Sequence, residues 1–146
     1  MDARDREIIQ LLQEDGRLSS AEIARAIGVS QGTVKRRLKL LRDDSVIKVI
    51  AVPDVEKMGN PVTGLIGIRV DPSRVNEVAD ALTNVKQIHY VAITTGSRDV
   101  YAWTAVSSTE DLGRLLTTEI GAIPGIKQIE TFLNLAIRKR SYGLVL

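Results

Sequence analysis

The residues best suited to chemistry in this 146-residue chain are five cations within eight positions. Lys35, Arg36, Arg37, Lys39 and Arg42 have no acid among them, although the formal net charge of the whole chain is only +2. Residues 51–146 carry ten basic and ten acidic side chains and therefore balance. A local cluster of cations on a near-neutral chain indicates one surface that binds a polyanion.

Residues for metal or covalent catalysis are scarce. The chain has no cysteine, which excludes disulfides, thiolate metal sites and cysteine nucleophiles, and His89 is its single histidine. We therefore expect no catalytic residues, no metal and no cofactor. No apolar run approaches the ~18 residues that a membrane span needs, and the first residues lack the pattern of a signal peptide, so we expect a cytoplasmic protein.

Three helices are predicted to position the cations. Residues 2–14 carry apolar residues at helical spacing and end at Asp15-Gly16. Ser19 and Glu22 form a capping box that begins a second helix. Gly28 can end that helix in the left-handed conformation, and Ser30 is a good N-cap for a third helix over residues 31–43. The apolar stripe of this third helix consists of Val34, Leu38 and Leu41.

The second and third helices match the description of a helix-turn-helix. They are short, a turn of three or four residues with a glycine joins them, and the second of the pair is basic on its outer face. The alternative is that exposed cations are only solvated. In a helix-turn-helix, we expect Gln31, Thr33 and Arg36 near base edges and Lys35, Arg37 and Lys39 near phosphates, with Ser30 at the helix start.

Three motifs in this region resemble the Lrp/AsnC family, the feast/famine regulators. They are D-x-x-D-x-x-I-I-x-x-L-x-x-D-G-R over residues 2–17, S-x-x-E-I-A over 19–24 and G-V-S-x-x-T-V-x-x-R over 28–37. The resemblance implies an N-terminal helix-turn-helix, a hinge strand, and a C-terminal effector and assembly domain of βαββαβ order.

The remaining chain has that order by its own pattern. Residues 46–52 are rich in β-branched residues and predict the hinge strand, and Pro53 follows. Strands are predicted over residues 62–70, 88–95, 100–107 and 129–137. One helix begins at Asp71-Pro72, and another begins at a capping box of Ser107 with Glu110. The predicted class is therefore α+β, with a helix-turn-helix domain (1–50), a hinge (51–61) and a ferredoxin-like domain (62–146).

One face of this predicted sheet lacks a cover. The helices of a ferredoxin-like domain lie on one side, yet these strands carry apolar residues on both sides. Tyr101 and Trp103 point to one face and could stack on RNA bases, but residues 100–106 lack the glycine-and-aromatic signature with flanking basic residues. We therefore expect packing, and a homodimer that assembles into higher oligomers.

The loop Thr95-Gly96-Ser97-Arg98-Asp99 resembles the effector-loop pattern T-G-x-aromatic-D of the family, with Arg98 at the aromatic position. The resemblance implies that Gly96, Ser97, Arg98 and Asp99 line an amino-acid pocket between dimers. Asp99 could accept from an ammonium group and Arg98 could pair with a carboxylate, which suits a zwitterion. The same residues also suit an ordinary hairpin loop with Arg98 and Asp99 solvated or paired with each other.

These patterns predict a sequence-specific DNA-binding transcriptional regulator. A small-molecule effector, expected to be an amino acid, would modulate it through changes in oligomer packing. The predicted partners are double-stranded DNA, the effector and further copies of the chain, with no membrane. One alternative is an architectural DNA-binding protein without an effector. Another is an enzyme similar to the siroheme decarboxylases, whose chemistry is associated with histidines; with only His89 present, we expect no enzyme.

Overall fold

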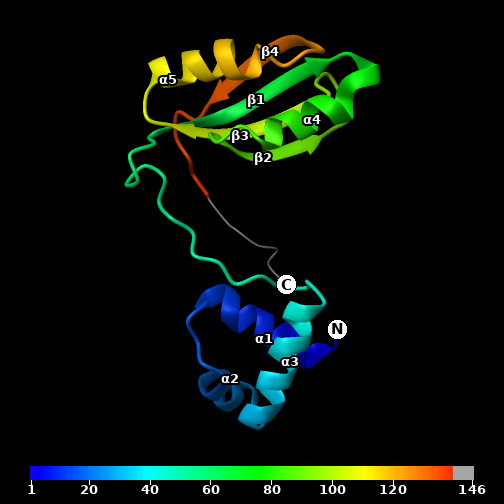
Figure 1. Cartoon of the computed structure of the whole chain (residues 1–146). Helices are drawn as coiled ribbons and strands as arrows, with labels where there is room; N and C mark the ends of the chain where they lie inside the picture. The colour runs from blue at the N-terminus through cyan, green and yellow to red at the C-terminus, as the bar shows by residue number, and fades with distance from the viewer. Residues whose placement is uncertain (140–146) are drawn as a thin grey trace. The chain divides into compact units, whose positions relative to one another are not determined.

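The computed structural model describes residues 1–139 and contains two compact units. Residues 1–52 belong to the first unit and residues 53–138 to the second. The first holds three helices and the second holds the four-stranded sheet with its helices (Figure 1). Residues 140–146, the end of the predicted C-terminal domain, lie outside the described residues.

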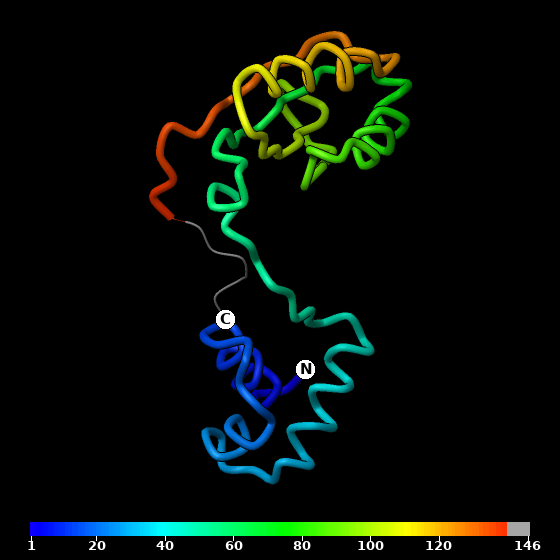
Figure 2. The backbone as a smooth tube through the Cα atoms, turned by 60° about the vertical axis from the view of Figure 1, so that its left-hand side comes forward, coloured from blue at the N-terminus to red at the C-terminus, as the bar shows by residue number. Residues whose placement is uncertain are grey.

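The first unit consists of α1 (Ala3–Glu14), α2 (Ser20–Ile27) and α3 (Gln31–Asp43), which follow one another as blue to cyan coils in Figure 2. The predicted capping box of Ser19 with Glu22 is present at the start of α2. Gly28 ends α2 with φ 68°, in the left-handed region, and the Ser30 side chain accepts from the Thr33 amide at 3.1 Å. These two local signals make the turn between α2 and α3 short.

The core of the first unit confirms the predicted stripe of α3. Its buried residues come from all three helices, so each helix depends on the other two for burial of its apolar face. They are Ile8, Ile9, Ile23, Ala24, Val34, Leu38 and Leu41.

The second unit is an antiparallel sheet with helices. Its elements in chain order are β1 (Val62–Val70), the 3₁₀ turn η1 (Pro72–Arg74), α4 (Val75–Thr83), β2 (Ile88–Ile93), β3 (Val100–Val106), α5 (Thr109–Arg114), the π-helical segment η2 (Leu115–Ile120) and β4 (Ile126–Leu133). The strand order is β2-β3-β1-β4, with every neighbouring pair antiparallel. This is the predicted ferredoxin-like arrangement.

The helices of the second unit share one core with one face of the sheet. Alternate residues of β1 and β3 point into it because successive side chains of a strand point to opposite faces. The buried residues from the strands are Ile66, Ile68, Val70, Ile88, Val100, Ala102 and Val106, and those from the helices are Val78, Ala79, Leu82, Leu112, Leu115 and Ile120.

Three local predictions differ from the structure. Residues 46–52 form no strand, because a strand needs a neighbour for its backbone groups and none pairs with this segment among residues 1–139. The helix expected to begin with Ser107 and Glu110 begins one residue later, where Ser108 caps the Asp111 amide. The last strand ends at Leu133 rather than at residue 137.

Candidate nucleic-acid interface and effector loop

The outer surface of α3 presents cations and a polar residue to solvent. Val34, Leu38 and Leu41 anchor the opposite side of the helix, so Gln31, Lys35 and Arg36 lie exposed. Lys39 is also exposed and pairs with Asp43 at 2.7 Å, a contact that raises the pKa of Lys39. Since both side chains of this pair are open to water, the pair adds little stability, and the Lys39 charge stays at the surface of α3.

Arg37 does not share this outer surface. Its guanidinium donates to the carboxylates of Asp2 and Asp5 on the N-terminal side of α1, with both distances 2.8 Å. The hydrogen bonds that Arg37 donates to Asp5 and Asp2 raise the pKa of Arg37 above its ordinary value. Only 24% of the Arg37 side chain is exposed. Arg37, which was predicted to contact a phosphate, is therefore held by partners within the chain and links α3 to α1.

Ser30 and Thr33 are joined to each other at the start of α3. Their hydroxyls lie 2.8 Å apart, and the Ser30 oxygen also accepts from the Thr33 amide. The Ser30 side chain therefore serves first as the N-cap of the helix. Of the seven residues predicted for DNA binding, Thr33 and Arg37 are partly buried, and the exposed ones are Ser30, Gln31, Lys35, Arg36 and Lys39.

The face of the sheet away from the helices carries a row of large side chains. Pairing places Tyr90, Trp103, Leu65 and Phe132 side by side across the four strands. We call this surface the open face. Tyr90 is 58% exposed and Phe132 is 46% exposed. The His89 ring lies beside Trp103, with ring centroids 5.6 Å apart. The predicted uncovered face is therefore present in the single chain.

The next row of the open face contains Gly67, and the Arg98 side chain lies over it. Gly67 pairs with Tyr101 on one side and with Glu130 on the other. A Cβ on Gly67 would come within 3.0 Å of both the Arg98 Cγ and the Tyr101 Cε1. The Arg98 guanidinium forms an ion pair with Glu130, and its side chain is only 13% exposed. Glycine therefore makes room for Arg98 to cross the sheet.

The predicted effector loop contains two residues with structural partners. The Asp99 carboxylate accepts from the Val70 amide at 2.7 Å, and its backbone amide donates to the Ile68 carbonyl at 3.0 Å. Gly96, with φ 113°, and Ser97 are exposed at the tip. The structure thus brings the four loop residues together, but it turns Arg98 and Asp99 toward the sheet and leaves Gly96 and Ser97 facing outward.

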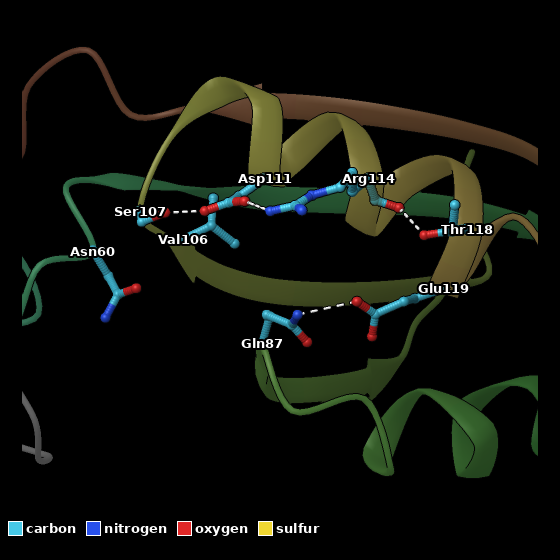
Figure 3. Close-up of a pocket in the computed structure, with 8 residues that line it drawn as sticks. All are labelled: Asn60, Gln87, Val106, Ser107, Asp111, Arg114, Thr118 and Glu119. Carbon is cyan, nitrogen blue, oxygen red and sulfur yellow. Dashed lines mark hydrogen bonds and ion pairs between the residues drawn. The ribbon is translucent and has the colours of Figure 1, made fainter.

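A separate polar pocket of about 380 Å³ lies at the other end of β3. Figure 3 shows polar and charged side chains of its lining joined to one another: Ser107 with Asp111, Asp111 with Arg114, and Gln87 with Glu119. None of the predicted effector residues lines it. This pocket is therefore distinct from the loop that the sequence indicated.

The partners of Arg37 and Arg98 could not be predicted from the sequence. Asp2 and Asp5 are more than thirty residues from Arg37, and Glu130 is 32 residues from Arg98. Such pairs depend on how elements pack, and local spacing does not encode that. The glycine at position 67, within an apolar strand, was a hint that another group approaches the strand there, because a strand glycine often marks such a close approach.

Comparison with known proteins agrees with both units. Residues 1–48 match the family model for winged helix-turn-helix DNA-binding domains, and residues 63–144 match the Lrp/AsnC ligand binding domain. An uncharacterized HTH-type transcriptional regulator of Pyrococcus furiosus is 35% identical over 146 residues, with 99% of each chain covered. The HTH-type transcriptional regulator FL11 of Pyrococcus abyssi is 33% identical, covering 99% of this chain and 95% of its own.

Solved structures show the same fold. AsnC of Escherichia coli superposes with a TM-score of 0.90 at 23% identity, with 97% of each chain covered. A transcriptional regulator of Neisseria meningitidis in complex with L-Met has a TM-score of 0.92 at 20% identity, covering 99% of this chain and 96% of its own.

The helix-turn-helix and the ferredoxin-like domain together define a DNA-binding transcriptional regulator with a ligand-binding domain. The chain belongs to the Lrp/AsnC family. No helix within residues 1–139 is long and apolar enough to cross a membrane.

Proposed function

We propose that α3 is the recognition helix of this regulator. Gln31 and Arg36 read base edges, while Lys35 and Lys39 contact phosphates. Ser30 and Thr33 contribute from the capped start of the helix. Arg37 supports the interface by fixing α3 to Asp2 and Asp5 of the neighbouring helix start. The exposed basic surface of α3, opposite its buried stripe, is the observation that carries this assignment.

The working form in this proposal is a homodimer that assembles further. A second copy covers the open face, because Tyr90 and Phe132 are too exposed and too large for an isolated sheet surface. Residues 46–52 pair with no strand of the described chain and offer the second copy another contact surface. Val49 and Ile50 in this segment are each more than half exposed. Two copies also provide two recognition helices, which suits a DNA site with two-fold symmetry.

The effector in this proposal is an amino acid that binds at the loop of Gly96 and Ser97. The exposed backbone there can donate to a carboxylate, and Asp99 keeps the loop in register with β1 through the Val70 amide. Arg98 belongs to the loop by its backbone and to the open face by its side chain, which reaches Glu130. A ligand at the loop therefore shifts a residue of the dimer surface, and this couples binding to oligomer packing.

Thermal-shift measurements with each amino acid, paired with sedimentation velocity, test this proposal. A ligand at 100 times its dissociation constant adds about 2.7 kcal/mol to the free energy of unfolding. We expect one amino acid to raise Tm and to change the oligomer distribution of the wild type. Arg98→Met keeps the stem of the side chain and removes its charge, so the ligand still raises Tm while the oligomer distribution no longer responds.

A screen in which no amino acid raises Tm contradicts the proposed effector and favours an architectural DNA-binding role. A ligand that changes the oligomers of wild type and Arg98→Met equally contradicts the role of Arg98 in coupling.

A further inference from the structure

Gly32 lies in the first turn of α3, on its exposed surface, two residues after the N-cap Ser30. Its backbone is not among those with positive φ. A Cβ added to it would meet only the Ser30 Oγ, at 3.9 Å, an ordinary contact. Neither the backbone conformation nor packing within the described chain therefore requires glycine at this position.

Glycine is also a poor residue for a helix. It loses more backbone freedom on folding than any other residue, and only proline is less favourable in a helix interior. A helix whose first turn contains an unneeded glycine forms less readily than the same helix with alanine. The position of Gly32 in α3 therefore calls for an advantage outside the folded chain.

The surroundings of Gly32 indicate what that advantage is. Lys35 and Arg36 follow it by three and four residues, so both lie next to Gly32 on the helix surface. Both are exposed, as is Gly32. The N-terminal part of a recognition helix is also the part that approaches base edges most closely.

We propose that Gly32 is the point of closest approach between α3 and DNA. The absent side chain lets the helix backbone lie against the wall of the major groove, and this sets the depth at which Gln31 and Arg36 meet the bases. This inference rests on the proposed role of α3 as the recognition helix. Gly32 acts through shape, and a larger residue holds the helix away from the groove even if that residue is a cation.

Two substitutions at Gly32 separate shape from charge. Gly32→Ala adds one methyl group, and Gly32→Lys adds a long side chain with a positive charge. Gly113 is the matched control, because it is an exposed helix glycine of α5 with nothing within 4 Å of an added Cβ. Each variant of the full-length protein is melted by circular dichroism and titrated by fluorescence anisotropy onto the duplex upstream of its own gene.

We expect Gly32→Ala and Gly113→Ala to raise Tm slightly, since both remove a helix glycine. Gly32→Ala weakens DNA binding by about tenfold, one decade in Kd. Gly113→Ala leaves Kd unchanged. Gly32→Lys weakens binding at least as much as Gly32→Ala, despite its added charge.

Unchanged Kd for Gly32→Ala, or tighter binding by Gly32→Lys, overturns the inference. These outcomes differ from failure of the recognition helix itself. If wild type binds the duplex and Arg36→Ala binds it weakly, α3 is the DNA-reading helix, and equal binding by Gly32→Ala refutes only the role of Gly32. If Arg36→Ala binds as wild type does, the assignment of α3 fails first.

Discussion

Arg36 and Arg37 are neighbours in the chain but meet different surroundings. Arg36 is exposed on the outer surface of α3, whereas Arg37 donates to Asp2 and Asp5. The helical turn causes the difference, because successive residues point about 100° apart around the axis. One arginine is thus open to solvent while the other holds two helices together.

We expect Arg37→Ala to lower the Tm of the protein, because Asp2 and Asp5 then lose their shared partner. The slope of log Kd against log salt concentration should stay as in wild type, since we propose no phosphate contact for Arg37. Loss of a phosphate contact changes that slope by about 0.9. Binding titrations at four salt concentrations decide the matter, and a slope change of this size with an unchanged Tm would show that Arg37 does reach DNA.

Among single residues, those able to bind a ligand or DNA could be identified from the sequence, whereas their contact partners could not. The cations of α3 and the loop glycine were identifiable from composition and spacing. The pairs Arg37 with Asp5 and Arg98 with Glu130 were not, because each joins elements distant in the chain. Long side chains also reach several ångströms, and the direction they take depends on the space that neighbours such as Gly67 leave.

The elements of the first unit are bounded by their own capping residues. Ser19, Gly28 and Ser30 satisfy the free backbone groups at the ends of α2 and α3. Their signals are local, so the sequence predicted α3 with the bounds that the structure shows. Residues 46–52 lack such local determinants, because a strand is defined by a partner and this segment finds none in the described chain.

Gly28→Ala tests the turn of the helix-turn-helix. Gly28 has φ 68°, and a Cβ there costs about 1 kcal/mol because it crowds the backbone in the left-handed conformation. Nothing lies within 4 Å of the added atom, so the strain is conformational alone. Chemical denaturation should show this loss, and Gly28→Asn should lose less because asparagine tolerates the conformation. Equal losses for the two variants would contradict this explanation.

The caps also predict a pH dependence. A hydrogen bond from the Asp5 amide, followed by one from Arg37, lowers the pKa of Asp2, and a hydrogen bond from the Ser19 hydroxyl lowers the pKa of Glu22. A carboxylate with a lowered folded pKa stabilises the protein fully above its unfolded pKa, and this stabilisation is lost as pH falls through the folded pKa.

We therefore expect the Tm difference between wild type and the double variant Asp2→Asn, Glu22→Gln to be constant near pH 6. It should shrink below about pH 4, the ordinary range of these groups. Thermal melts in steps of half a pH unit provide the measurement. A difference that persists unchanged to pH 3 would show that the two charges do not carry the effect.

The whole molecule combines the exposed cations of α3 with the apolar open face of the sheet. The open face carries a row of side chains in which Tyr90 and Phe132 are exposed and Trp103 is half-buried. A second copy that covers this row removes its apolar atoms from water, at about 25 cal/mol per Å². The sequence predicted this face from alternation on both sides of the strands, but the arrangement of the copies is not encoded in one chain's pattern.

Trp103→Glu places a charge in the middle of the open face. In the assembled protein that carboxylate would be buried without a partner, so we expect the dimer to dissociate at concentrations where wild type remains assembled. Asn76→Glu, on the exposed surface of α4, is the control for added charge and should leave assembly unchanged. Sedimentation equilibrium of the three proteins gives the result, and an assembled Trp103→Glu variant would mean that the copies meet elsewhere.

Whether α3 reads DNA is tested by the affinity of the purified protein for the DNA upstream of its own gene, relative to a random duplex, across a range of salt concentrations. Arg36→Ala is compared with Lys86→Ala, which removes one exposed cation from the second unit. We predict that wild type and Lys86→Ala prefer the upstream DNA and that Arg36→Ala loses this preference. Equal binding of all three proteins to both duplexes would contradict a recognition role for α3.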